Sequence, residues 1–314
     1  MKSDTELNTQ IFTEEEQAQL RKLRGKVTEL QVHIIDAQRN HTTEDFKTIS
    51  SESLSKANIS LNWMYRQLDA LIKHDANDKQ GFIKLIETLY NQVAGDAITL
   101  SPKEPEKTPP SEEGRVSDPL VGKTYYALSD INDALTELLI DGFIQHEQSM
   151  RPKSKPYKIM TLKDEQTAKK EQASTTQSVS RIDRIKSATK KCIDTLNKHG
   201  ATFEVGVDGE SIHSKLEAVA NSPSGNYQAF ANHVKALNHK MFSTNIEANK
   251  KADDTTHENH TAAEEAFWAL FYMEKAVIKE LASGFYEQRA KGQPTHETSE
   301  PTMKPLAKKD IFLQ

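Results

Sequence analysis

Apolar residues recur every three or four positions in seven long stretches of this chain, which is the spacing of one face of an α-helix. The first stretch opens with Thr13 and Glu16, a pair with capping-box spacing, and continues as a heptad-like seam over 20–37. The pattern predicts helices at 14–40, 51–74, 78–94, 123–149, 178–199, 224–251 and 257–290, and a shorter one at 210–220. Residues 202–209 alternate polar and apolar side chains, but two glycines favour a loop or a single hairpin arm there.

Two stretches without a helical pattern divide the chain. Residues 101–110 contain four prolines and no large apolar side chain, and residues 150–177 are basic and then rich in Gln, Ser and Thr. We therefore predict an all-α protein with two bundles of about four helices each, joined by a basic flexible spacer. The predicted parts are a disordered N-terminus (1–13), an N-terminal bundle (14–149) with a disordered Pro-rich spacer (96–118), a linker (150–177), a C-terminal bundle (178–291) and a disordered tail (292–314).

The composition supports this fold class and excludes several kinds of site. With 12 Gly and 11 Pro in 314 residues, the chain has few of the residues that turn-rich β folds need. Its one cysteine, Cys192, excludes an internal disulfide and a Cys-built zinc site, and it lies on an apolar helix face typical of a core residue. No apolar run is long enough for a transmembrane helix, and residues 1–6 lack a signal-peptide core. The predicted location is the cytoplasm, or a host cell reached without a cleaved signal peptide.

The chain lacks the common catalytic motifs, including phosphate-binding glycine loops, nucleophile elbows and HExxH. One set of potential metal ligands has helical spacings of 3, 3 and 4, which would place its members on one face: Asp254, His257, His260 and Glu264. A solvated helix start rich in acidic residues explains the same set without a metal. We therefore expect no cofactor and no catalysis, and a metal-dependent helical-bundle enzyme is the alternative.

A basic segment offers a second hypothesis, because residues 151–200 carry 13 basic and 5 acidic side chains. Its helix presents five basic residues on a polar face: Arg181, Arg184, Lys186, Lys190 and Lys191. A basic amphipathic helix is the usual form of a binder of anionic membrane surfaces, and a basic patch also suits nucleic acid. Burial in a bundle, with the charges paired inside the protein, explains the same pattern.

The function that the sequence favours is a non-catalytic helical adaptor that binds other proteins. Heptad-like seams in 20–37, 54–71 and 227–241 suit helix–helix association within the chain, with partners or between copies of the chain. Ile311, Phe312 and Leu313 follow a polar tail and are predicted to bind a partner or to dock on the protein itself. Trp63 and Trp268 lie among apolar residues and are predicted to pack in the core. The polar composition and this tail resemble, in a general way, effectors that bacteria secrete into host cells, which implies a protein partner but no particular site.

Overall fold

The computed structural model describes residues 10–39, 50–100, 119–150, 180–201, 203, 210–253 and 260–290, without the side chains of 119–122. Eight helices lie in these ranges: α1 (Glu14–Arg39), α2 (Ser51–Ile72), α3 (Lys79–Thr99), α4 (Pro119–Ser149), α6 (Arg181–His199), α7 (Ile212–Ala220), α8 (Tyr227–Asp253) and α9 (His260–Ala290). Helix accounts for 88% of the described residues, and they contain no strand, which confirms the predicted all-α class. No helix in the described part combines the length and apolar character needed to cross a membrane.

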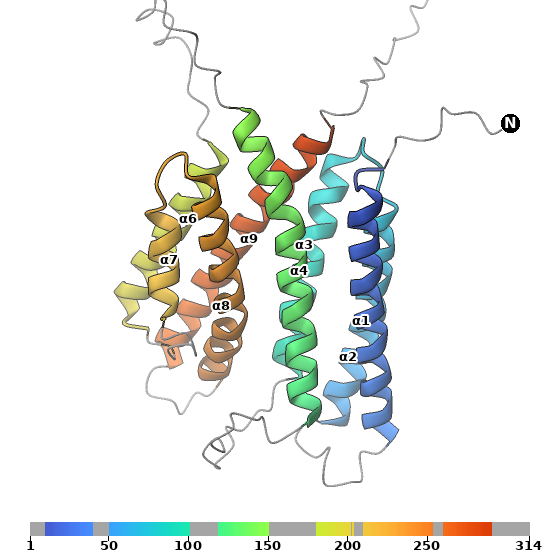
Figure 1. Cartoon of the computed structure of the whole chain (residues 1–314). Coiled ribbons are helices and arrows are strands. Elements are labelled where there is room, and N and C mark those ends of the chain that lie inside the picture. The colour runs from blue at the N-terminus through green and yellow to red at the C-terminus, as the bar shows by residue number, and fades with distance from the viewer. Residues whose placement is uncertain are drawn as a thin grey trace, which may run out of the picture.

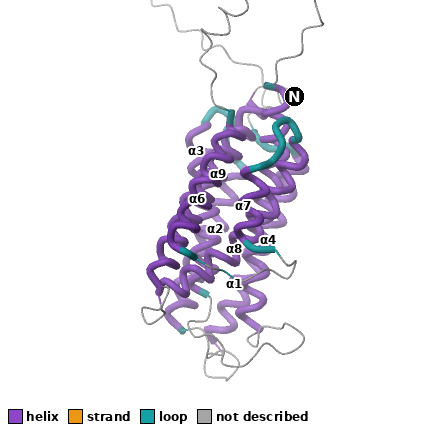
Figure 2. Tube along the Cα trace, turned by 90° about the vertical axis from the view of Figure 1, so that its left-hand side faces the viewer, coloured by secondary structure: helices purple, strands orange, loops and turns teal. Residues whose placement is uncertain are grey.

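The helices form two groups that share one core. Helices α1 to α4 pack against one another in one group, and α6, α7, α8 and α9 form the other (Figure 1). Helix α9 also packs against α3 and α4, so it touches both groups, and the buried apolar residues of all eight helices form one continuous cluster. Most of the helices run roughly along the long axis of the molecule, and α9 crosses behind α4 obliquely (Figure 1 and Figure 2). The two-bundle prediction is therefore loosely consistent with the grouping, and the groups are joined where α3 and α4 pack against α8 and α9.

Local signals set several helix ends where the sequence predicts them. The backbone N–H of Glu16 donates to Thr13 Oγ1 (3.2 Å), and the N–H of Thr13 donates to Glu16 Oε2 (2.8 Å), so the capping box is formed. Gly200 ends α6 with a positive φ of 62°, a conformation that favours glycine. These two ends confirm the boundaries that capping chemistry predicts.

Most of the other boundaries differ from the prediction by a few residues, and two differences bear on the core. Helix α3 does not stop at Gly95 but continues to Thr99, inside the predicted Pro-rich spacer. Val93, Ala97 and Leu100 stay on the buried face, and this packing outweighs the cost of roughly 1 kcal/mol for a glycine inside a helix.

The second difference lies in the segment predicted as a disordered N-terminus. Ile11 and Phe12 are buried, and the Phe12 ring lies 5.9 Å from Phe82 and 5.4 Å from Phe285, measured between ring centroids. Two apolar residues are too few to show a helical period, so their burial depends on distant contacts that the local pattern does not reveal. Most of the strand-like stretch 202–209 lies outside the described residues.

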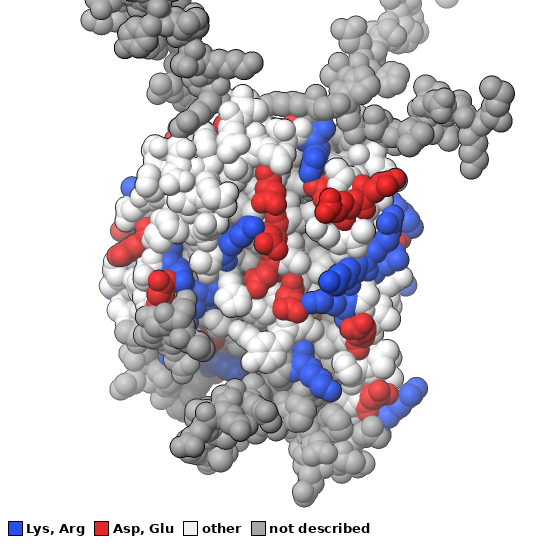
Figure 3. Space-filling model, viewed as in Figure 1, with Lys and Arg blue, Asp and Glu red and all other residues white. Residues whose placement is uncertain are grey.

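Ion pairs flank α4 on the face seen in Figure 3. Acidic side chains run along the middle of this face, with basic side chains on both sides. The pairs from α1 and α8 to α4 are Lys26–Asp130 (2.6 Å), Lys235–Glu137 (3.1 Å) and His239–Asp133 (2.7 Å). Exposed ion pairs contribute only about 0–1 kcal/mol each to the free energy of folding, so these pairs add little to the stability of the protein.

The two longest helices, α4 and α9, approach closely because a glycine of each faces a phenylalanine of the other. A methyl group on Gly142 would overlap the ring of Phe285, and one on Gly284 would lie 2.6 Å from Phe143 Cδ2. Both phenylalanines are fully buried. The pairs Gly142–Phe285 and Gly284–Phe143 therefore interlock reciprocally, and we call them the glycine–phenylalanine interlock.

We predict that Gly142→Ala and Gly284→Ala each destabilise the protein. Overpacking of the interlock should cost more than the alanine gains in helix propensity, so the free energy of unfolding should fall by about 1–2 kcal/mol. Urea unfolding followed by circular dichroism measures the effect. Gly25→Ala is the matched control, because nothing lies within 4 Å of that position and it is inside α1. This control should raise stability by roughly 0.5–1 kcal/mol, and equal losses at all three sites would contradict the interlock.

Candidate interaction surface

The structure pairs much of the predicted basic face of α6 within the chain. Arg184 donates to both carboxylate oxygens of Glu280 at 2.7 Å, and Arg181 donates to Glu280 (3.2 Å) and to Glu287. Lys186 Nζ donates to the carbonyl oxygen of Ser222 at 2.5 Å. Lys190 and Lys191 are exposed. Arg184 is exposed as well, although it is paired with Glu280. Binding to an anionic surface stays a prediction.

Glu287 on α9 is the centre of a charge cluster that joins four helices. Its carboxylate accepts a hydrogen bond from Lys79 of α3 (2.5 Å) and one from Arg181 of α6, and lies 3.2 Å from His146 Nε2 of α4. Burial acts to raise the pKa of Glu287, but the bonds from Lys79 and Arg181 prevail and lower it to about 2. The cluster therefore holds the two groups of helices together through an ionised carboxylate.

The predicted metal set is only partly within the described residues. His260 and Glu264 lie at the start of α9, whereas Asp254 and His257 lie outside the described ranges, so the set remains a prediction. Among the residues that are described, no three His, Cys, Asp or Glu side chains converge as metal ligands would. The predicted partner-binding residues Ile311, Phe312 and Leu313 also lie outside the described part of the chain.

An exposed group of aromatic rings lies on the first half of α9, and we call it the α9 aromatic surface: Phe267, Trp268, Phe271 and Tyr272. Trp268 is 44% exposed and Tyr272 is 62% exposed, while the two phenylalanines are half-buried. Neighbouring rings touch, with Trp268 lying 5.3 Å from Phe267, 5.9 Å from Phe271 and 5.9 Å from Tyr272 between ring centroids. The rings thus form one contiguous apolar patch.

This patch corrects the prediction that both tryptophans pack in the core. Trp63 is 57% exposed on α2, beside the fully buried Met64, and Trp268 is exposed on α9. Consecutive residues of a helix point about 100° apart, so a residue next to a core position faces a different side. The sequence does contain a signal for the patch, namely the consecutive aromatic pairs 267–268 and 271–272. Because neighbouring residues of a helix point in different directions, the two members of each pair cannot both face the core. Cys192 is buried as predicted, and burial raises its thiol pKa to about 12.

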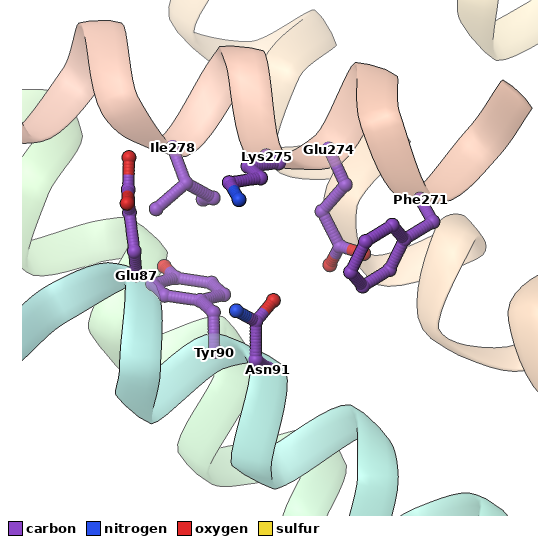
Figure 4. Close-up of a pocket in the computed structure, with 7 residues that line it drawn as sticks. All are labelled: Glu87, Tyr90, Asn91, Phe271, Glu274, Lys275 and Ile278. Carbon is purple, nitrogen blue, oxygen red and sulfur yellow. The ribbon is translucent and has the colours of Figure 1, made fainter. Parts of the chain in front are cut away.

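A small pocket opens beside the aromatic surface, between α3 and α9. Its empty space is about 240 Å³ only when open solvent at the mouth is counted, and the volume open to the centre of a water-sized molecule is about 10 Å³. The residues that line it are drawn in Figure 4: Glu87, Tyr90, Asn91, Phe271, Glu274, Lys275 and Ile278. Phe271 belongs to both the pocket and the patch. The pocket is therefore a shallow recess at the edge of the aromatic surface, with room for about one water molecule.

Buried polar groups form the floor of this pocket. Glu274 accepts a hydrogen bond from Asn245 Nδ2 of α8 (3.0 Å), and the Tyr90 hydroxyl lies 2.7 Å from Thr136 Oγ1 of α4. Burial raises the pKa of Glu274 to about 7, against the opposing effect of the Asn245 bond. Burial also raises the pKa of Tyr90. The helices α3, α4, α8 and α9 therefore meet around a carboxyl group that is easily protonated near neutral pH.

The chain has no significant match to a protein-family model, to a curated protein or to a solved structure. Its candidate site therefore rests on the geometry described above.

We predict that Glu274→Gln flattens the pH dependence of stability. The folded-state pKa lies above the ordinary value of 4.5, so the wild type should lose stability as pH rises from about 4.5 to about 7. Glutamine keeps an acceptor for Asn245 without ionising, and its relative stability should increase by on the order of 2–3 kcal/mol across this window. Urea unfolding at a series of pH values measures the difference, and an increment that does not change with pH would refute the assignment.

Glu287→Gln should show the opposite pH behaviour. The folded-state pKa of about 2 lies below the ordinary 4.5, so the charge of Glu287 stabilises the fold above about pH 4.5 and this contribution disappears as pH falls toward 2. The variant should be less stable than the wild type at pH 7, and the two unfolding curves should converge in acid. A difference that persists unchanged at pH 2 would show that packing, rather than charge, dominates at this position.

Proposed function

We propose that this protein is a non-catalytic helical interaction protein, and that the α9 aromatic surface is its binding surface. The observation that carries the proposal is the contiguous patch of four rings, of which Trp268 and Tyr272 are open to solvent. Large contiguous apolar patches on soluble proteins are typical of interaction sites. Tryptophan and tyrosine are also the residue types that contribute most strongly to binding at protein interfaces.

The support beneath the surface strengthens the proposal. Helix α9 packs against α3, α4, α6 and α8, and the other side of the helix buries Leu270, Met273 and Val277. A binding surface on a helix held from several sides is ordered before it meets a partner, so binding costs less conformational entropy.

The adaptor prediction thereby gains a specific surface that the seams alone did not identify. Most residues of those seams are buried within the chain, including Leu30, Leu61 and Met241. The interpretation as a secreted effector rests on composition and on residues outside the described ranges, and it stays a prediction.

The test compares two double variants with matched chemistry. Trp268→Ser with Tyr272→Ser removes the exposed rings of the α9 aromatic surface. Trp63→Ser with Tyr126→Ser removes a tryptophan and a tyrosine that are 57% and 61% exposed elsewhere on the molecule. The full-length proteins are used as bait for affinity capture from the native host, followed by mass spectrometry.

Partners that bind the α9 aromatic surface should be lost from the first variant, at least tenfold, and retained by the second, because truncating a central aromatic residue of an interface costs about 2 kcal/mol or more. Circular dichroism must show that both variants keep the wild-type helix content. Equal partner recovery with both variants would refute this surface as the binding site.

A further inference from the structure

Four residues lie along a single line on the exposed side of α9, and we call them the α9 stripe: Glu264, Trp268, Phe271 and Lys275. Their spacings of 4, 3 and 4 place each residue directly above the last on the helix surface. An acidic residue stands at one end, a basic residue at the other, and two aromatic residues lie between. Glu264 and Lys275 are exposed, and neither forms an ion pair with another described residue.

This order is self-complementary under a two-fold axis. An axis placed between Trp268 and Phe271, perpendicular to the helix, aligns α9 antiparallel to the α9 of a second copy. Glu264 of each copy then lies opposite Lys275 of the other, and Trp268 lies opposite Phe271. A two-fold interface needs this property, because each of its contacts occurs twice.

The chemistry along the stripe is divided as it is in stable interfaces. The aromatic residues occupy the centre, where desolvation contributes most, and the charges occupy the ends, where they remain solvated and select the register. Phe267 and Tyr272 flank the stripe and extend the apolar contact.

We propose that the partner of the α9 aromatic surface is a second copy of this chain, in a two-fold dimer with antiparallel α9 helices. The inference rests on the proposed function for the identity of the surface, and it adds the partner and its orientation. The ends of the stripe determine the orientation, since a parallel alignment would place Glu264 opposite Glu264 and Lys275 opposite Lys275.

Sedimentation equilibrium of the full chain tests the dimer over a concentration range of about 1–200 µM, which covers dissociation constants typical of modest interfaces. The wild type should sediment as a concentration-dependent dimer. Glu264→Lys alone and Lys275→Glu alone should each weaken dimerisation by about tenfold or more, because like charges then meet at both ends of the interface.

Combining the substitutions separates charge pairing from damage to the fold. The double variant Glu264→Lys with Lys275→Glu restores opposite charges across the axis, and it should dimerise within about threefold of the wild type. A mixture of the two single variants should form mixed dimers in preference to either homodimer. Glu265→Lys, which makes the same charge change one position off the stripe, is the control and should leave dimerisation unchanged.

Three results would overturn the proposal. A monomer throughout the concentration range would exclude the dimer. Dimerisation that survives Trp268→Ser with Tyr272→Ser would place the dimer interface elsewhere. If the protein is a monomer, the substitution Phe312→Asp is tested in a Trp63→Phe background, in which Trp268 is the remaining tryptophan. A change in Trp268 fluorescence would then show that the chain's own tail covers the α9 aromatic surface. If the protein is a monomer and still captures partners through Trp268, the proposed function stands without the dimer. If it forms a dimer that responds to the Glu264 and Lys275 substitutions as expected but captures no other protein, only this inference is supported.

Discussion

The close approach of α4 and α9 is the constraint on which the rest of the architecture depends. Because Gly142 and Gly284 lack side chains, Phe285 and Phe143 can each fill the space opposite a glycine. Phe82 then stacks on Phe285 at 5.7 Å, with the two ring planes 11° apart, and Phe12 contacts both rings. One pair of glycines thus sets the distance between the two longest helices and the position of the aromatic core at that end of the molecule.

The position of α9 explains both the stability and the surface chemistry of the molecule. One side of the helix is committed to four neighbours, and its last turns carry the charge cluster around Glu287. The outward face of the first half of α9 carries the rings of Trp268 and Tyr272, with exposed charged residues such as Glu264 beside them. The helix that is held in place by packing in the core is therefore also the helix that carries the apolar patch. This packing gives the patch a fixed shape.

The sequence predicts the helices well because their signals are local. Capping at Thr13 and Glu16, the glycine stop at Gly200 and the apolar periodicity all act within a few residues. The features that it missed depend on residues far away in the chain. Ile11 is buried only because distant helices cover it, and Glu16 pairs with Arg289, 273 positions later.

The candidate site was harder to predict than the fold, for a geometric reason. An aromatic residue in an amphipathic pattern is equally compatible with the core and with the edge of the apolar face, and hydrophobicity alone does not separate the two. Trp63 stands one position from the buried Met64, and Trp268 stands two positions from the buried Ala266 and Leu270, so the helical rotation of about 100° per residue decides their environment. The basic residues of α6 show the same difficulty, since only the three-dimensional position of Glu280 shows where Arg184 is paired.

The burial of Ile11 and Phe12 against the last helix has a consequence for how the protein is made. The chain leaves the ribosome N-terminus first, so Phe12 and Phe82 emerge long before Phe285, which contacts both rings. Helices can form during synthesis, but the aromatic core cannot close until α9 has left the exit tunnel. Phe12 and Phe82 therefore lack their contacts with Phe285 until α9 has been synthesised, so this part of the core closes only after α9 has emerged.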